Sequence, residues 1–297
     1  MKEIIFITKQ GTKLKRKDNQ IIAILGTEKI GAFPINRIKK IFLFGNIEIT
    51  MPAVNFLLSK NAEIYLLSQV GNFKGLITNT KLESNYNLRL TQYRAFINEN
   101  SNLETAKFFV LKKIISIEKF TQTDLKELKN GLSNAKRYKE ILGIEGTASA
   151  FFFDTFRKNL KINLGFKKRE YRPAKDPVNA LLSFVYSLFY SLLFSFIKAK
   201  GFDPYIGYLH RKRGTHAVLA SDFMEIFRVE LSKFILILFN NEVFTPADFE
   251  KSTRGVYLKE ESLRKFLEIF KENFIDQNKY ISKMEQATNE FIKVLGV

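Results

Sequence analysis

The strongest constraint on the fold is a change of pattern near residue 80. Before it, short segments rich in Ile, Phe, Leu and Tyr alternate with glycines, which is typical of strands and turns. After it, long segments carry apolar residues three and four positions apart, and proline is nearly absent. The pattern therefore predicts an α+β fold, with a small N-terminal β-rich domain followed by a larger all-helical domain.

The expected boundaries follow from this change. We expect a β-rich domain over residues 1–78, a polar linker over 79–87 and a helical domain over 88–297. Within the first domain the expected strands are 3–8, 21–25, 38–44, 47–50, 64–68 and 73–78, with a short helix over 52–60. Long helical segments are expected over 88–97, 103–120, 124–142, 263–274 and 280–295.

One segment, residues 180–197, carries no charge and is long enough to cross a bilayer. Serines recur every four residues along it, at 183, 187, 191 and 195. Asp176 and Pro177 precede it as an N-cap and a first-turn proline, and Lys198 ends it. A thin serine ridge lets neighbouring helices approach closely, so we expect a buried helix of a soluble protein. A membrane anchor is the alternative.

Composition narrows the classes of function. The chain has no cysteine, which excludes disulfides, thiolate catalysis and cysteine-based zinc sites, and fits a reducing cytoplasm. Its 48 Lys and Arg outnumber its 30 Asp and Glu, for a formal net charge of +18. Such an excess favours a polyanionic partner, either nucleic acid or an anionic membrane surface. A lysine-rich surface that serves only solubility is the ordinary alternative.

The two histidines of the chain, His210 and His216, lie six positions apart, shortly before Asp222 and Glu225. Imidazole is a good ligand for Mn²⁺ or Zn²⁺ and a possible general base. Asp222 and Glu225 are three positions apart and share one helix face. Two alternatives stay open. Asp222 and Glu225 could form a capping box, with Ser221 as another cap, and His210 could simply bind a backbone carbonyl.

Glu145 is surrounded by apolar and small residues on every face of a helical segment, which predicts that its carboxylate is buried. A buried charge is costly unless it pairs with a cation or binds a metal, and both possibilities stay open. Gly143 and Gly146 cost about 1 kcal/mol each in a helix. Their presence suggests that something approaches this backbone closely.

Basic residues gather in two further segments and form a plausible floor for a nucleic-acid backbone. These candidates are Lys167, Lys168, Arg169, Arg172 and Lys175 in the first segment and Arg211, Lys212 and Arg213 in the second. Arg228 could orient the nearby acids or contact phosphate. A solvated charge run and a weak surface ion pair are the alternatives. Sequence motifs for nucleotide hydrolysis, dinucleotide binding or Ser-His-Asp catalysis have no supporting context.

Four motifs in order carry a resemblance to a known family. They are Ile-Glu-Gly at 144–146, Arg-Pro-Ala-Lys-Asp-Pro-Val-Asn-Ala-Leu-Leu at 172–182, Pro-Tyr-Ile-Gly-Tyr-Leu-His at 204–210 and Ser-Asp-Phe-Met-Glu-Ile-Phe-Arg at 221–228. With the small β domain, linker and larger helical domain, they make nearly the whole chain resemble the CRISPR-associated spacer-acquisition integrase family, Cas-one.

This resemblance implies a divalent-metal-dependent DNA endonuclease and integrase of antiviral defence. Such an enzyme joins captured foreign DNA to the CRISPR repeat array by phosphodiester strand transfer. The helical domain would be catalytic, with Mg²⁺ or Mn²⁺ held by Glu145, His210 and Glu225, and with Asp222 as a further acid. The family often has Asp where this chain has Glu225, while His216 matches no ligand position.

The resemblance also implies partners. The family forms a homodimer through its β domains and a complex with a small Cas-two subunit, and it binds foreign and repeat DNA in the cytoplasm without a membrane. A non-catalytic nucleic-acid binder and a membrane-associated basic protein are the competing classes.

Overall fold

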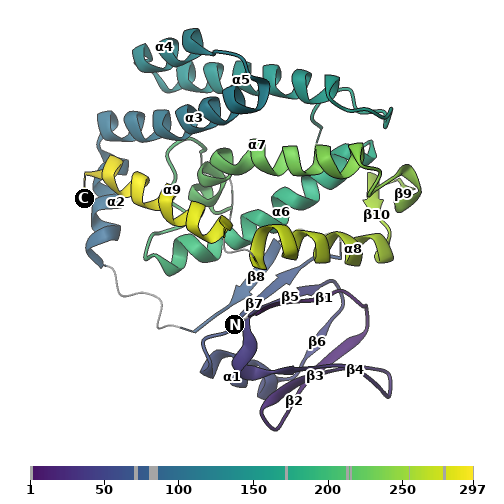
Figure 1. The fold of residues 1–297 in the computed structure, drawn as a ribbon. Helices are drawn as coiled ribbons and strands as arrows, with labels where there is room; N and C mark the ends of the chain where they lie inside the picture. Colours follow the sequence, from purple (N-terminus) through teal and green to yellow (C-terminus); the bar gives the residue numbers. More distant parts are fainter. Residues whose placement is uncertain are drawn as a thin grey trace. The chain divides into compact units, whose positions relative to one another are not determined.

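The computed structural model describes residues 3–69, 73–79, 86–170, 173–211, 214, 216–253, 255–276 and 279–296. The chain forms two compact units (Figure 1). The first comprises Met1–Lys81 together with Leu258–Tyr280, and the second comprises Leu82–Tyr257 together with Ile281–Val297. Most of the expected linker, residues 80–85, lies outside the described part of the chain.

The first unit contains two four-stranded sheets. One has the order β1 (Glu3–Ile7), β5 (Ile38–Phe44), β7 (Glu63–Leu67) and β8 (Phe73–Ile77). Its first three strands are parallel and β8 is antiparallel to β7. The other has the order β4 (Glu28–Pro34), β3 (Gln20–Leu25), β2 (Thr12–Lys17) and β6 (Glu48–Ile49). A short 3₁₀ turn, η1 (Ile35–Arg37), and one helix, α1 (Met51–Ser59), connect strands of this unit.

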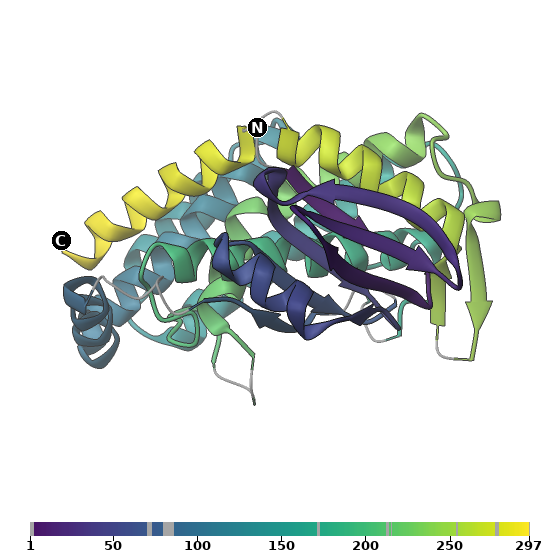
Figure 2. The same cartoon turned by 90° about the horizontal axis from the view of Figure 1, so that it is seen from below.

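The hydrophobic core of this unit lies between its two sheets (Figure 2). Alternate residues of β1 and β5, such as Ile5 and Ile41, belong to the same buried cluster as Leu14 and Ile21 of the other sheet. Ala53 and other apolar residues of α1 complete the cluster. The alternation follows from strand geometry, in which successive side chains point to opposite faces.

Two strands of the first unit, β2 and β4, were not expected from the sequence. β2 is mostly basic, and only Thr12 and Leu14 are buried on its inner face. Leu14 pairs in register with Ala23 of β3. β4 has no buried residue, so it shows no apolar alternation. Neighbouring strands supply the hydrogen-bonding partners of these segments, a tertiary effect that a local pattern does not reveal.

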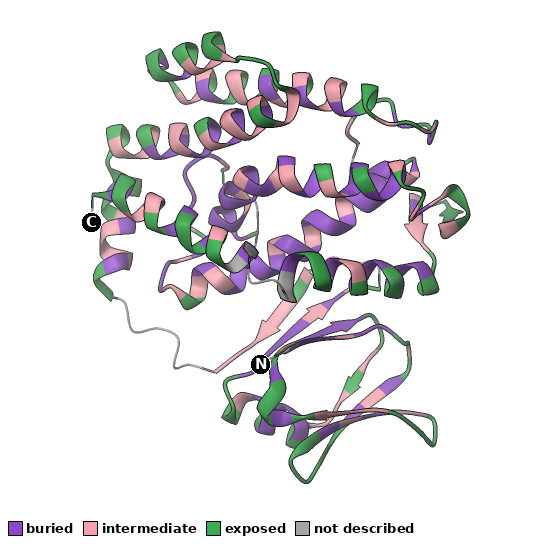
Figure 3. Ribbon diagram, viewed as in Figure 1, coloured by how far each residue is buried: buried purple, intermediate pink, exposed green. Residues whose placement is uncertain are grey.

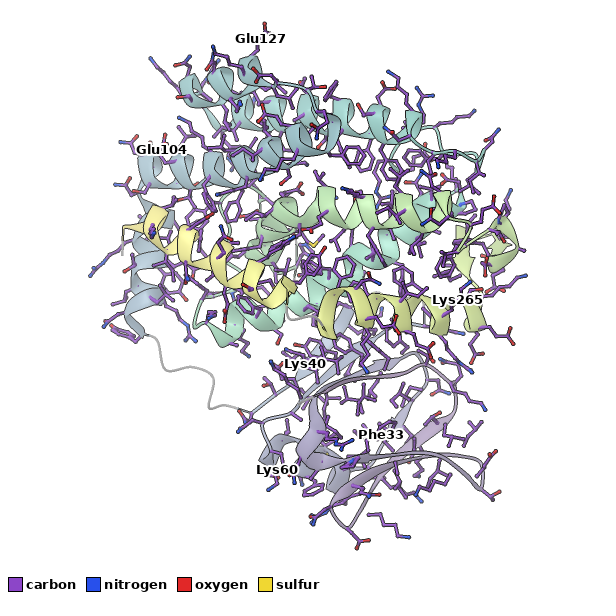
Figure 4. All side chains as sticks on the ribbon, viewed as in Figure 1. Phe33, Lys40, Lys60, Glu104, Glu127 and Lys265 are labelled. Carbon is purple, nitrogen blue, oxygen red and sulfur yellow. The ribbon has the colours of Figure 1, made fainter. Side chains whose placement is uncertain are left out.

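A segment distant in sequence also belongs to the first unit. It contains α8 (Glu260–Phe270), which carries Lys265, and the π-helical η4 (Lys271–Asp276). The helical character of 263–274 was expected, but its membership of the first unit was not. Within the sheet of the same unit, Lys40 of β5 forms an ion pair with Glu63 of β7 and also donates to the Tyr65 hydroxyl at 3.0 Å (Figure 4).

The second unit is built mainly from long helices. These are α2 (Tyr86–Ile97), α3 (Glu99–Thr121), α4 (Lys126–Asn134), α5 (Tyr138–Lys158), α6 (Pro177–Ala199), α7 (Val218–Asn240) and α9 (Lys279–Leu295). α3 packs against α5 and α7, and α6 packs against α7. The single helix expected over 124–142 is wrong, because Ala135 leaves the helix in an extended conformation and α5 starts afresh at Tyr138.

α6 is a core helix. Asp176 accepts a hydrogen bond from the Asn179 amide at 2.8 Å, which confirms the expected N-cap. Among the described residues, α6 is the one helix long and apolar enough to cross a membrane, yet 78% of its most apolar window is buried inside the structure (Figure 3). Ser191 and Ser195 are buried, and Tyr186 shares a 2.5 Å hydrogen bond with Ser232 of α7. The helix is therefore buried, as expected, and two of the four serines of its ridge, Ser191 and Ser195, are buried with it.

The predicted fold class is confirmed: a β-rich N-terminal region is followed by a helical part. One detail of that prediction is wrong. The helices are interrupted after α7 by the short η3 (Pro246–Asp248) and by a two-stranded sheet of β9 (Phe249–Ser252) and β10 (Gly255–Leu258).

Candidate active site

A turn between α6 and α7 carries His210, and Asp222 of α7 holds that turn in place. The Asp222 carboxylate accepts hydrogen bonds from the backbone amides of Tyr208 at 2.6 Å, Leu209 at 3.1 Å and His210 at 2.9 Å. Its Oδ1 also lies 2.8 Å from Nδ1 of the His210 ring. Asp222 is fully buried. One carboxylate thus fixes both the backbone and the ring of His210.

Gly207 allows the turn to approach α7 this closely. A Cβ atom at this position would lie 2.6 Å from Cγ1 of Val218, 2.8 Å from Oδ2 of Asp222 and 2.9 Å from the Val218 backbone carbon. Any side chain here would therefore push the turn away from α7. Only glycine, which has no Cβ atom, fits at this position.

The orientation of the ring leaves the second nitrogen of His210 facing Glu225. Nε2 lies 3.8 Å from Oε1 of Glu225, which is one helical turn after Asp222. Because Nδ1 faces the Asp222 carboxylate, the proton of the neutral ring belongs on Nδ1 and the lone pair on Nε2. The imidazole therefore presents a ligand or base nitrogen beside a carboxylate.

Glu225 is almost completely buried between two cations. Its Oε1 accepts from Nη2 of Arg228 at 2.7 Å, and its Oε2 accepts from Nζ of Lys113 at 2.5 Å. Arg228 also lies over the Tyr186 ring, 4.8 Å from its centre. Two roles were expected for Arg228, and the structure shows one of them: Arg228 orients a nearby acid, Glu225.

Glu145 reaches the same group from α5. Its carboxylate forms an ion pair with Lys113 and accepts from the Ser149 hydroxyl at 2.8 Å. The Glu145 side chain is 23% exposed, so it is less buried than expected. Of the two possibilities left open for this residue, pairing with a buried lysine is present in the structure. Lys113 joins Glu145 to Glu225 and hence to His210.

The charges of the site set two pKa values. Burial alone raises the pKa of Glu225, but the charges of Arg228, Lys113 and His210 lower it to about 2. Burial alone lowers the pKa of His210, but its hydrogen bond to Asp222 and the charges of Asp222 and Glu225 raise it above the usual value. Glu225 is therefore ionised at neutral pH, and His210 binds its proton more tightly than an exposed histidine does.

Lys113 was missed in the sequence although a signal was present. It lies on α3 within the apolar series Ala106, Phe109, Val110, Ile114 and Ile117, all buried. A lysine at a core position of a helix needs a buried anionic partner. Lys113 is 2% exposed and has two such partners, so its place in the apolar pattern could have identified it.

The local explanations for Asp222 and Glu225 as helix caps are wrong. α7 begins at Val218 with Ala217 as its N-cap, so both acids lie inside the helix. Ser221 does not cap it either, and its hydroxyl lies 2.6 Å from Nε2 of His216. The His216 ring stacks on Tyr190 with centroids 4.9 Å apart, so this histidine contacts Ser221 and Tyr190 at the start of α7.

The donor atoms of the group suit a hard or borderline divalent ion, which prefers carboxylate oxygen and imidazole nitrogen. Among the described residues, however, no three His, Asp or Glu side chains lie close enough together to hold a metal ion as they stand. Lys113 contacts both Glu145 and Glu225. The donor set therefore fits a metal chemically, provided that the two glutamates change their contacts with Lys113.

The expected basic floor is only partly described. Arg172, Lys212 and Arg213 lie outside the described residues. Lys167, Lys168 and Arg211 are exposed, and Arg211 lies 4.8 Å from the centre of the Tyr138 ring. Two others have partners within the chain. Arg169 donates to Asn179 and Ser183, both at 3.0 Å, and Lys175 lies 3.4 Å from Glu170.

Among the described residues, the close approach expected at Gly143 and Gly146 is not made. No described atom lies within 4 Å of a Cβ built at either glycine. Both glycines lie on the exposed side of α5, next to Glu145.

Comparisons with known proteins place this geometry in a family. Residues 5–272 match the family described as CRISPR associated protein Cas1. The chain is 30% identical to CRISPR-associated endonuclease Cas1 1 of Thermodesulfovibrio yellowstonii, over 95% of this chain and 94% of that protein. It is 31% identical to CRISPR-associated endonuclease Cas1 3 of Thermus thermophilus, over 88% and 80%.

Solved structures agree with the sequence comparisons. A CAS1 protein from Thermotoga maritima superposes with a TM-score of 0.86 at 25% identity, covering 99% of this chain and 96% of that one. A casposase bound to its integration product shares the fold at 22% identity, with a TM-score of 0.83 and coverage of 92% and 83%. The family match spans most of the chain and both compact units, and the chain therefore belongs to the CRISPR-associated Cas1 family.

Proposed function

We propose that this protein is a divalent-metal-dependent DNA endonuclease and integrase of CRISPR adaptation. It joins captured foreign DNA to the CRISPR repeat array by phosphodiester strand transfer. One observation supports this function above the others: Glu145, Glu225 and His210 come together from three separate segments of the chain. The names of its Cas1 relatives describe endonucleases, which supports the same reaction class.

Glu145, His210 and Glu225 would hold the Mg²⁺ or Mn²⁺ ion through carboxylate oxygen and imidazole nitrogen. Such an ion, when bound, stabilises negative charge on a phosphodiester and aligns the attacking oxygen. Asp222 serves a different purpose from the one expected of a ligand, because its oxygens already accept three backbone amides and face the His210 ring. We therefore assign Asp222 as the residue that orients His210.

The remaining residues prepare the site before DNA binds. Arg228 and Lys113 keep Glu225 ionised, and the Asp222 contact leaves the lone pair of Nε2 of His210 available as the ligand nitrogen. The pKa of His210 is raised because the carboxylates of Asp222 and Glu225 face its ring. Exposed lysines such as Lys167 and Lys168 would hold the DNA backbone, together with Arg172, Lys175, Arg211, Lys212 and Arg213.

We infer partners from the same family. Structural neighbours include a Cas6-RT-Cas1–Cas2 complex and a Cas1–DNA complex, which support foreign and repeat DNA and a small Cas2 subunit as partners. A homodimer formed through the β-rich domain and a cytoplasmic location complete the proposal. The burial of α6 argues against a membrane anchor.

Strand transfer by purified variants tests this function. Glu145→Ala and His210→Ala should abolish joining of a DNA fragment to repeat DNA while they retain most of the affinity for DNA, because neither removes a lysine or arginine of the proposed basic floor. His216→Gln is the matched histidine control and should retain joining, since its ring packs on Tyr190. Full joining by either site variant would contradict the proposed site and favour a non-catalytic DNA binder.

A further inference from the structure

Lys113 lies within the proposed metal site, although the proposed ligands of that site are two carboxylates and an imidazole. It comes from α3, is 2% exposed, and contacts Oε1 of Glu145 and Oε2 of Glu225. A metal ligand set could be completed without any lysine. The cation is instead placed between the two glutamates that would coordinate the ion.

The surrounding charges explain why a cation is required there. Glu225 and Asp222 are both buried, and Glu145 is close enough to share one ammonium group with Glu225. Carboxylates this close repel one another and, in a buried site, take up protons unless a cation intervenes. Arg228 neutralises one side of Glu225 only, through Oε1. Lys113 supplies the charge on the other side and links α3, α5 and α7.

The same contacts oppose a metal ion. A divalent ion bound by Glu145 and Glu225 competes with the ammonium group for carboxylate oxygens, and it is repelled by that group at short range. With Lys113 in place, the carboxylates of Glu145 and Glu225 face two fixed cations, Lys113 and Arg228. Without Lys113, they face Arg228 alone, and the site attracts a divalent ion more strongly.

We propose that Lys113 is an internal counter-ion that holds the metal-free site together and weakens divalent-ion binding, so that the ion binds reversibly. This inference rests on the proposed metal-dependent function. It assigns Lys113 a positioning role, because it acts through Glu145 and Glu225. A lysine that only stabilised the fold would leave the affinity for the ion unchanged.

Calorimetric titration with Mn²⁺ tests the assignment on the full chain. Lys113→Met should bind Mn²⁺ at least about tenfold more tightly than the unaltered protein, which corresponds to about 1.4 kcal/mol. Lys113→Gln should do the same, and its amide can still donate to both glutamates if the methionine variant folds poorly. Lys112→Met is the matched control, because Lys112 pairs with Glu290 and its loss changes the net charge of the chain equally.

Thermal unfolding supplies a second readout. Metal-free Lys113→Met should unfold at a lower temperature than the unaltered protein. Saturating Mn²⁺ should raise the unfolding midpoint of this variant by more than it raises that of the unaltered protein. Equal or weaker Mn²⁺ binding by both Lys113 variants would overturn the inference when the unaltered protein binds and Glu145→Ala does not. Absence of Mn²⁺ binding by the unaltered protein would instead overturn the metal-dependent function, and the role of Lys113 with it.

Discussion

Replacing Asp222 with asparagine should destabilise the protein and reverse the tautomer of His210. The carboxylate accepts three backbone amides and faces Nδ1 of His210 with no exposure to solvent. Asparagine keeps one acceptor oxygen and places an NH₂ group where the other oxygen was. If the oxygen faces the amides of Tyr208 and Leu209, the NH₂ group faces two donors of His210.

The magnitude follows from the contacts that are lost. Two hydrogen bonds to a charged acceptor contribute about 1.5–3 kcal/mol each, so the free energy of unfolding should fall by about 3–6 kcal/mol. The imidazole can restore one contact by accepting through Nδ1, which moves its proton to Nε2. Nε2 then no longer presents a lone pair to Glu225, and strand transfer should be lost along with stability.

Two measurements read these effects separately. Urea unfolding gives the change in stability, with Asp154→Asn as a control that should change it by less than about 0.5 kcal/mol, because Asp154 is an exposed surface acid. Nitrogen-15 spectra of labelled histidine give the tautomer, and the chain has only two histidines to assign. An unfolding free energy within about 1 kcal/mol of the original, or an Nε2-protonated His210 in the unaltered protein, would refute the reasoning.

Two further predictions concern the turn and the pH dependence. Gly207→Ala should lower the free energy of unfolding by about 1–3 kcal/mol because its Cβ would overlap Val218 and Asp222, whereas Gly143→Ala has open space and should be neutral or stabilising; urea unfolding of both variants decides this. The pKa of Glu225 falls from 4.5 to about 2 on folding, so its ionised form stabilises the protein above pH 4.5 and this contribution, about 3 kcal/mol, is lost as the pH falls toward 2. Unfolding measured across this range should show a shallower pH dependence in Glu225→Gln, and an unchanged slope would contradict the assignment.

Much of the fold and part of the site were predictable because they depend on local patterns. Short runs of Ile, Phe, Leu and Tyr separated by glycines identified β1, β3, β5 and β7, and helical spacing identified α3. β2 was missed because its six residues include four basic ones, and the β3 strand beside it supplies most of the reason for its conformation. A short polar strand becomes recognisable only through its partner.

For the site, residue chemistry identified Glu145, His210 and Glu225 as candidates, and the resemblance to a family connected them. The resemblance also implied Asp222 as a further acid of the metal site. Its actual contacts with the turn before it show that both oxygens are already used. Which of the two acids holds the turn depends on how α7 is rotated about its axis relative to that turn. The spacing of residues in the sequence does not give this rotation.

The sequence by itself determined the α+β class, the strongly basic character and the identity of the acids and the histidine, because these follow from composition and from the period of apolar residues. The tertiary structure alone decided that a lysine of α3 lies between Glu145 and Glu225. It also decided that Asp222 contacts and orients His210, where the sequence had suggested a further metal ligand. The physical reason is burial: a charge removed from water must take its partner from whichever helix packs against it, and that neighbour is a property of the fold.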